Sequence, residues 1–415
     1  MTTKLYQHDV YLQHWDARVL SVISRSNSEQ ADLILDRTAF FPEGGGQSCD
    51  VGTIGPWKVI DVQERDGEII HTVNLGKDAL RPAEGEHWPC AIDWPRRFDN
   101  MQRHCGEHIL SGILYARCGG VNRGFHMGED YMTIDISLED DPTDPDTVRP
   151  EQIDMTLAME CERRANQVIW SDEKVTVFRF DKRDEVKDRP LRKVLAFDED
   201  ISIVCVGSPE NASDCVACCG THPSSAGQVG LIKIYKVENY KGMFRIYFEA
   251  GARALADYDH KHALLSDLAA GHSCSINDLP GKIRGLEERI SSVRDELYHL
   301  KKALIRNERA GLDAALASSP EPAVIWTLED LPLDDVFGMA KAYMGKVPRL
   351  LLLYAKKDTS FILASDGSIK CGSLVREYAS FYSGKGGGND VSARVIFSDE
   401  ENALLFADLI QKHLR

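Results

Sequence analysis

The first ninety residues alternate apolar and polar side chains in short runs that are separated by turn-forming residues. These runs include VLSVIS, DLILDRTAF, GTIG and WKVIDVQERDGEIIHTV. Short strands at close spacing, with no helical period between them, are typical of a small barrel or sandwich. We therefore predict a small β-barrel domain over residues 1–92.

The pattern changes after residue 92, where a strand leads into a helix that Gly119 and Gly120 are predicted to end. The apolar side of this helix carries Ile109, Leu110, Ile113 and Leu114. Strands follow around residues 126–136, then a helix over 150–169, and then VTVFRF, ISIVCV and LIKIYKVENYKGMFRIYFE as further strands. This order predicts an α+β domain over residues 93–250.

Helix-forming residues dominate after residue 250, with one helix predicted over 252–271 and another over 280–311. Apolar residues in the second helix recur in alternating steps of three and four, which is the spacing of a coiled-coil seam. The seam residues are Ile283, Leu286, Ile290, Val293, Leu297, Leu300 and Leu304. We predict a helical hairpin or a dimeric coiled coil over residues 251–315, in preference to a lone surface helix.

Residues 323–415 alternate predicted strands and helices in the order βαββαβα, which indicates a compact C-terminal α/β domain. With 415 residues and 43% apolar content, the chain is long enough for two or three globular units. The fold class expected for the whole chain is α+β.

The composition of the chain indicates the cellular compartment of the protein. The N-terminal residues are polar and charged, unlike a signal peptide, and no segment approaches the roughly 18 to 20 apolar residues that cross a membrane. Eleven cysteines scattered along the chain, an odd number, do not suit a secreted disulfide framework. We therefore expect a cytoplasmic protein with no membrane partner.

The net charge of −16 argues against a protein that coats nucleic acid without specificity. A local basic surface would still allow contact with RNA, and two segments could supply one: residues 181–194 and the helix over 280–311. Mixed charge of this kind is also typical of a solvated face. The candidate contacts in the first segment are Lys182, Arg183, Arg192 and Lys193.

Two pairs of side chains have the spacing of metal ligands. His104 and His108 lie four residues apart on the predicted helix, and Cys218 and His222 are four apart in CCGTHPSSAGQVG. Together they suit a tetrahedral zinc site with cysteine and histidine ligands. The alternatives are two ordinary helix histidines with a buried thiol, or Cys215 as a ligand in the CxxC of Cys215 and Cys218. A zinc ribbon would need a second CxxC, which the chain lacks.

A glycine run, Gly44, Gly45 and Gly46, precedes Gln47 in TAFFPEGGGQSCDVG. Consecutive glycines let the backbone approach a ligand closely, and the Gln47 amide can both donate and accept hydrogen bonds. The alternative is a simple hairpin turn between strands. Neither nucleotide-binding glycine pattern is present, so a nucleotide-cofactor site is not predicted.

The order TxFxPxGGGQxxxxG, HxxxH and CxxTHxxxxGxxG resembles the editing domain of alanyl-tRNA synthetases and the free-standing alanyl-tRNA editing proteins. The resemblance covers about residues 5 to 250 and includes segments around His126 and Arg245. The loop GKGGGND at 384–390 resembles the C-terminal, DHHA1-related domain of those synthetases. This domain order is similar to the long form of the editing proteins. No class II synthetase core is recognisable, so charging of tRNA is not expected.

The resemblance implies hydrolysis of the ester that joins serine, or glycine, to alanine tRNA. It implies one Zn²⁺ per chain on His104, His108, Cys218 and His222. It also implies substrate binding by Thr38 and the GGGQ loop (Gly44, Gly45, Gly46 and Gln47), with Thr38 reading the serine hydroxyl. Arg245 joins the basic residues above as a candidate tRNA contact.

Two other functions fit the same motifs: an inactive zinc-containing tRNA-binding regulator, and a zinc hydrolase of another acyl ester. We also expect a homodimer through the helical and C-terminal regions, because the heptad seam leaves a row of apolar residues to cover. The sequence does not decide whether zinc would activate water or only position the substrate.

Overall fold

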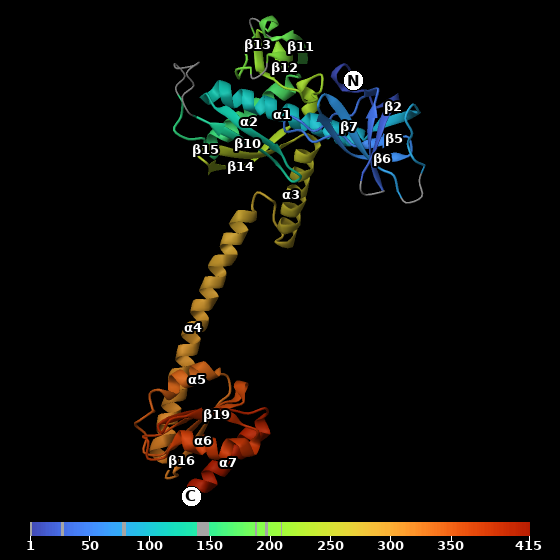
Figure 1. Cartoon of the computed structure of the whole chain (residues 1–415). Helices are drawn as coiled ribbons and strands as arrows, with labels where there is room; N and C mark the ends of the chain where they lie inside the picture. The colour runs from blue at the N-terminus through green and yellow to red at the C-terminus, as the bar shows by residue number, and fades with distance from the viewer. Residues whose placement is uncertain are drawn as a thin grey trace. The chain divides into compact units, whose positions relative to one another are not determined.

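The computed structural model describes residues 2–25, 29–76, 80–138, 149–186, 189–195, 198–208 and 210–415. The chain divides into two compact units, Met1–Asp267 and Leu268–Arg415 (Figure 1). Both units mix helices with sheets, so the fold class is α+β. None of the helices in the described residues has the length and apolar character needed to cross a membrane.

Unit 1 begins with six antiparallel strands that close into a barrel. In the order of the barrel these are β2 (His14–Ser24), β3 (Gln30–Leu35), β7 (Glu68–Asn74), β6 (Trp57–Arg65), β5 (Gly52–Ile54) and β8 (His87–Ile92). Alternate residues point inward and fill the interior with side chains such as Leu33, Trp57 and Val62. Two short parallel strands, β1 (Thr3–Lys4) and β4 (Arg37–Thr38), lie before the glycine loop.

The helix α1 (Trp94–Cys118) leads out of the barrel. The Asp93 carboxylate caps its first turn by accepting a hydrogen bond from the Arg96 N–H. The helix ends at Gly119, which adopts the left-handed conformation with φ of 64°, as the sequence predicts. Buried apolar residues of α1 belong to the hydrophobic core of the part of unit 1 that follows the barrel.

A four-stranded antiparallel sheet covers one side of α1, in the order β14 (Ile232–Tyr240), β15 (Met243–Ala250), β10 (Met132–Ser137) and β9 (Val121–Met127). The helix α2 (Met155–Trp170) shares the apolar core between α1 and this sheet. It begins later than the predicted residue 150, because Asp154 caps it by accepting from the Leu157 N–H.

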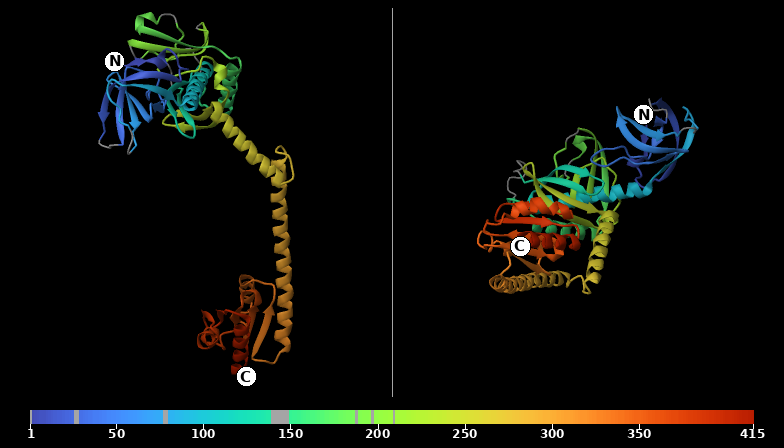
Figure 2. Two further views of the ribbon diagram at one scale, coloured as in Figure 1. Left: turned by 90° about the vertical axis from the view of Figure 1, so that its right-hand side faces the viewer. Right: turned by 90° about the horizontal axis from the view of Figure 1, so that it is seen from below.

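A three-stranded sheet of β11 (Val175–Lys182), β12 (Glu199–Ser208) and β13 (Asn211–Ala217) lies beside α1 (Figure 2). Gly112 makes this close approach feasible, since a Cβ there would lie 2.2 Å from the Ser213 carbonyl oxygen. The contact brings the end of β13 next to the middle of α1. Unit 1 ends within α3 (Gly251–Gly271).

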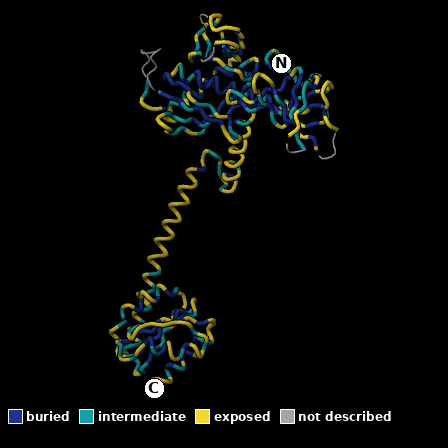
Figure 3. Tube along the Cα trace, viewed as in Figure 1, coloured by how far each residue is buried: buried dark blue, intermediate teal, exposed yellow. Residues whose placement is uncertain are grey.

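After the last residues of α3, unit 2 continues with α4 (Leu279–Ser318), a single helix that extends past the predicted residue 311. The predicted seam residues from Ile283 to Leu300 are all exposed, and α4 is coloured as exposed over most of its length in Figure 3. Only from Leu304 onward do its apolar residues pack against the domain that follows.

The C-terminal domain has a mixed five-stranded sheet between two helical layers. The strand order is β16 (Ala323–Leu328), β17 (Leu350–Ala355), β18 (Ser360–Ala364), β20 (Ser392–Ile396) and β19 (Lys385–Gly388). The end of α4 and α5 (Leu333–Ala340) cover one face, and α6 (Cys371–Tyr378) and α7 (Glu400–Leu414) cover the other. The glycine-rich segment expected as a loop forms the exposed edge strand β19.

Candidate metal centre

The two histidines of α1 lie one turn apart and face β13. His104 and His108 are each 2% exposed, and their ring centroids are 5.2 Å apart. Such burial is unusual for two neighbouring imidazoles unless each has a partner. The helix therefore presents them inward, to groups from other elements.

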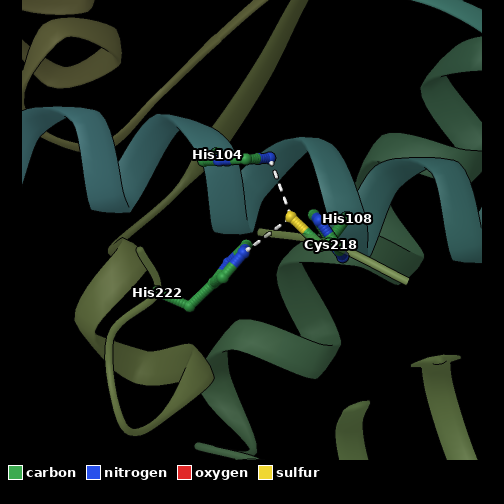
Figure 4. A group of neighbouring side chains, drawn as sticks. All are labelled: His104, His108, Cys218 and His222. Atoms are coloured by element: carbon green, nitrogen blue, oxygen red, sulfur yellow. Dashed lines mark hydrogen bonds between the residues drawn. The ribbon is translucent and has the colours of Figure 1, made fainter. Parts of the chain in front are cut away.

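The other two metal-type residues follow β13 in a turn that lies against α1. Cys218 and His222 approach the α1 histidines from this turn (Figure 4). Gly220 allows the approach, since a Cβ there would lie 2.3 Å from Cε1 of His104. The structure thus brings together all four residues of the two sequence pairs.

One ligand atom from each of these four residues lies within 4.8 Å of the others. The Cys218 sulfur is 3.5 Å from Nε2 of His104 and 3.4 Å from Nε2 of His222. In a tetrahedral site with metal–sulfur bonds of about 2.3 Å and metal–nitrogen bonds of about 2.0 Å, sulfur and nitrogen would be about 3.5 Å apart. The cluster can therefore hold a metal ion at its centre.

Second partners fix the orientation of two of the imidazoles. Nδ1 of His104 donates to Oε1 of Gln47 at 2.9 Å, and Nδ1 of His108 donates to the Asp214 carboxylate at 3.1 Å. Nε2 of each ring is then left facing the cluster, which is the usual arrangement around a metal-binding histidine. Nδ1 of His222 is buried and has no hydrogen-bond partner within the described residues.

Burial and the neighbouring charges shift the pKa values of the cluster residues. Burial alone would raise the pKa of the Cys218 thiol, but His104, His108 and His222 lower it well below its ordinary value. Burial would likewise lower the pKa of His108, but the Cys218 thiolate and Asp214 raise it to about 10. For His222 burial prevails and lowers the pKa to about 4. A thiolate among imidazoles is the donor set that a soft or borderline metal ion prefers.

A second carboxylate, Glu107, lies beside the cluster and is buried. Its Oε1 accepts hydrogen bonds from the Ser111 hydroxyl and the Asn122 amide, both at 2.6 Å. Its Oε2 is 3.9 Å from Nε2 of His108. The sequence reasoning did not select Glu107, Asn122 or Asp214, although Glu107 and Asp214 lie within four residues of a predicted ligand.

The cluster opens into a cavity of about 490 Å³, which is in the range for a small ligand. Gly45 and Cys219 line it near the glycine loop, and Phe125 stacks on His104 with ring centroids 5.5 Å apart. Strand β9 and the segment 192–195 form further wall. A volume of this size accepts the end of a substrate and excludes a folded macromolecule.

The glycine loop is attached to the ligand-bearing turn. Gln47 is fully buried, its Nε2 donates to the Thr221 hydroxyl at 2.8 Å, and its Oε1 also accepts from the Thr221 N–H. Gln47 thus lies behind His104, where it bonds both the imidazole and the ligand-bearing turn. Gly46 has φ of 81° and faces the Phe125 ring, while Gly44 forms a bridge with Gln47.

Thr38 lies away from this cavity. Its side chain is fully buried, and its hydroxyl lies 2.8 Å from Nε2 of His71 and accepts from the Phe40 N–H. Burial lowers the pKa of His71 to about 4, so the ring is neutral and Nε2 can accept the hydroxyl proton. The hydroxyl is therefore fully engaged, and its predicted role in substrate selection stays a prediction.

The candidate tRNA contacts occupy three different environments. Lys182 and Arg183 are exposed. Arg245 pairs with Asp135 at 2.7 Å and stacks on Tyr240. Two residues of the same group, Arg192 and Lys193, line the cavity.

Arg192 corrects the expectation of a solvated basic segment. It is 7% exposed, and its guanidinium holds the Asp214 carboxylate at 2.6 Å. Burial of Asp214 would raise its pKa, but Arg192 and His108 keep it below the ordinary value. The Asp214 carboxylate is buried, and a buried charge is costly without an opposite charge beside it. Arg192 and the segment around it therefore lie inward, next to this carboxylate.

Cys215 has a partner other than the cluster. It forms a disulfide with Cys205 on the neighbouring strand β12, 10 residues away in the sequence. Cys218, which could have been its CxxC partner, lies in the metal cluster. This arrangement favours Cys218 over Cys215 as the ligand.

Family comparisons match two parts of unit 1. Residues 8–96, essentially the barrel, match the family "tRNA synthetases class II (A)". Residues 201–247, which include Cys218 and His222, match the "Threonyl and Alanyl tRNA synthetase second additional domain".

Among curated proteins, the alanyl-tRNA editing protein AlaX-L of Pyrococcus horikoshii is 30% identical over 409 residues, covering 95% of this chain and 94% of that protein. The alanine–tRNA ligase of Pyrococcus abyssi is 28% identical over 424 residues, and that of Ignicoccus hospitalis is 27% identical over 414. The chain spans 42% of the length of each of these two ligases. The end-to-end match confirms the resemblance drawn from the motifs: the chain belongs to the family of AlaX-L alanyl-tRNA editing proteins.

Proposed function

We propose that this protein is a trans-editing hydrolase that removes serine, and also glycine, from mischarged alanine tRNA in the cytoplasm. One observation carries the proposal. Three histidines and a cysteine converge within 4.8 Å at the wall of a cavity, in a chain that matches an editing protein over nearly its whole length. The products would be the free amino acid and the uncharged tRNA.

The residues present fit one Zn²⁺ per chain, held by His104, His108, Cys218 and His222. A thiolate and imidazole nitrogens are the usual zinc ligands, and the ligand spacing matches a tetrahedral site. When bound, Zn²⁺ would supply Lewis acidity toward the ester or lower the pKa of a water molecule. Gln47 and Asp214 would hold two of the imidazoles in the orientation that such a site needs.

Glu107 would position the attacking water. Its Oε1 is occupied by Ser111 and Asn122, whereas its Oε2 faces the cluster 3.9 Å from His108. That oxygen can accept a hydrogen bond from a water molecule beside the ester carbonyl. An aminoacyl ester is reactive already, so a positioned water contributes mainly by proximity.

Substrate selection is proposed for Thr38, with the glycine loop (Gly44, Gly45, Gly46 and Gln47) close to the amino acid. The tRNA would be contacted by Lys182, Arg183, Arg192, Lys193 and Arg245. The exposed cations Lys182 and Arg183 suit backbone phosphates best, because they are solvent-accessible.

The domain boundaries are proposed as 1–92, 93–250, 251–315 and 323–415, the last a DHHA1-like domain. We also propose a homodimer through α4. Flanking its exposed seam, Glu287 and Arg294 lie on one side and Arg289 and Glu296 on the other. In an antiparallel pair these positions would bring opposite charges together.

Release of serine from seryl-tRNA of alanine specificity tests the proposed function. The purified protein should release serine rapidly and spare correctly charged alanyl-tRNA. Binding of tRNA without release would instead indicate a regulatory protein. Hydrolysis of a simple acyl ester, with seryl-tRNA left intact, would indicate another hydrolase.

A further inference from the structure

The cavity beside the metal cluster has two cations in its wall that lack protein partners. Arg123 comes from strand β9, and Lys193 comes from the segment after β11. Among the described residues, neither side chain has a hydrogen bond or an ion pair. Asp200 also lines the cavity, but it forms no ion pair with either of them.

The net charge of the chain is −16, so carboxylates are abundant. The buried arginines Arg97, Arg103 and Arg192 are each paired with a carboxylate. Glu107 and Asp200 line the same cavity as Arg123 and Lys193, but within the described residues neither forms an ion pair with these two cations. The two cations therefore remain available to an anion from outside the protein.

A β-bulge directs Arg123 to the cavity. Asp135 of β10 pairs with Gly124, but the next residue of β10 pairs with Asn122, so Arg123 is the extra residue in β9. A bulge interrupts the alternation of side chains along a strand. Asn122 and Arg123 consequently both line the cavity. Asn122 is buried and donates to Glu107, whereas Arg123 is exposed.

Arg192 anchors the segment that carries Lys193. The Arg192 N–H donates to the Cys215 carbonyl at 2.8 Å, and its guanidinium grips Asp214. Lys193 is therefore fixed next to a rigid residue while its own ammonium group has no partner. Burial, followed by the charge of Arg192, lowers the pKa of Lys193; Glu107 and Asp214 oppose this effect, and Arg123 adds to it. An anion between the two cations would remove this repulsion.

We infer that Arg123 and Lys193 form an anion subsite that binds a phosphate of the 3′-terminal nucleotides of tRNA while the ester lies at the metal cluster. The subsite rests on the proposed function. Its chemistry is that of two cations in the wall of one small cavity, which suits the phosphodiester next to the terminal ribose. Binding of this phosphate would hold the aminoacyl ester of the tRNA beside the metal cluster.

Kinetics at several salt concentrations test the subsite. Arg123→Gln, Lys193→Gln and the double variant should raise KM for seryl-tRNA by about tenfold per residue, with a much smaller change in kcat. The slope of log kcat/KM against log salt should fall by about one for each cation removed. Lys58→Gln, an equal charge change on the barrel outside this cavity, is the control.

Direct binding separates the subsite from the reaction. A short RNA ending in CCA should bind the wild type more tightly than the double variant, whereas adenosine without phosphate should bind both equally. The inference is overturned if the double variant keeps the KM, the salt slope and the RNA affinity. It is also overturned if inorganic phosphate binds but the RNA does not. A wild type that binds the RNA but releases no serine would refute the proposed function and leave the subsite standing.

Discussion

Helices α1 and α4 are both long, but they differ in how much they bury and in which side chains they leave exposed. Fifteen of the 25 residues of α1 are buried, whereas α4 buries 2 of its 40. The buried set of α1 includes Arg103, His104, Glu107 and His108, and the exposed set of α4 includes most of its apolar seam. Figure 3 shows the difference along the trace.

Each helix departs from the ordinary rule in one respect: α1 buries several polar side chains beside its apolar ones, and α4 exposes apolar side chains beside its polar ones. In α1 every one of those polar side chains has a partner: Glu249 binds Arg103, and Gln47 and Asp214 bind the histidines. In unit 2, nothing among the described residues covers the α4 seam before Leu304. The buried polar residues of α1 belong to the metal cluster and its surroundings, and the exposed apolar residues of α4 form the seam on which the proposed dimer rests.

The largest effect should come from removing two ligands of the cluster. His104→Ala with Cys218→Ala should abolish metal binding and reduce serine release by at least about 10³-fold, because two of four donors are lost. Metal analysis and single-turnover deacylation measure the two effects. His126→Ala, an exposed histidine on β9, is the matched control. Unchanged zinc in the double variant would place the metal elsewhere.

The α4 seam should respond in its assembly and not in its chemistry. Ile290→Asp with Leu297→Asp places two charges in the proposed interface, which should raise the dimer dissociation constant by at least about 100-fold. Light scattering over a concentration series measures this. Ser292→Asp with His299→Asp adds the same charge off the seam. A wild type that is already monomeric would contradict the dimer.

The partner of a ligand should matter less than the ligand. Asp214→Asn keeps the shape but removes the charge that His108 and Arg192 share, and loss of such a partner typically lowers metal affinity by about 10- to 100-fold. Zinc competition with a chelator provides the measurement, and Asp135→Asn, paired with Arg245 outside the cavity, is the control. Equal zinc affinity in the two variants would reduce Asp214 to a packing role.

Local patterns predicted the four residues that form the cluster, but they did not predict the surroundings of the cluster. The spacing of His104 and His108, and of Cys218 and His222, is a property of one helix and one turn, so it can be read along the chain. Arg192 looked like a solvated cation, because Asp214 lies 22 residues away and meets it only across the strands. Arg123 gave no signal, because a bulge depends on the register of two strands.

The same distinction between local and long-range interactions explains which helices and strands the sequence predicted correctly. The helical periods located α1 and α4, since core contacts repeat every three to four residues. Their exact ends depended on caps such as Asp154, which delays α2 relative to the predicted start. The glycine segment in β19 was read as a loop, because glycine favours turns, but pairing with β20 makes it an edge strand.

The smallest effect is expected at Thr38. This residue lies in the barrel and not in α1, so it tests whether a buried polar residue away from the metal cluster also takes part in the reaction. Thr38→Val removes the hydroxyl that bonds His71 and the Phe40 N–H, which should cost about 1–3 kcal/mol of unfolding free energy. If Thr38 also reads the serine hydroxyl, the ratio of seryl- to alanyl-tRNA hydrolysis should fall by at least about tenfold.

Thr72→Val separates the two roles of Thr38. Thr72 is also buried in the barrel, and its hydroxyl donates to Asp32 at 2.8 Å, so its loss should cost similar stability without affecting selection. Denaturant unfolding and the two deacylation rates are measured for both variants. A stability loss at Thr38 with an unaltered ratio would make it a structural residue of the barrel. Discrimination would then belong to groups that line the cavity, such as Gly45 and Phe125, whose ring stacks on His104.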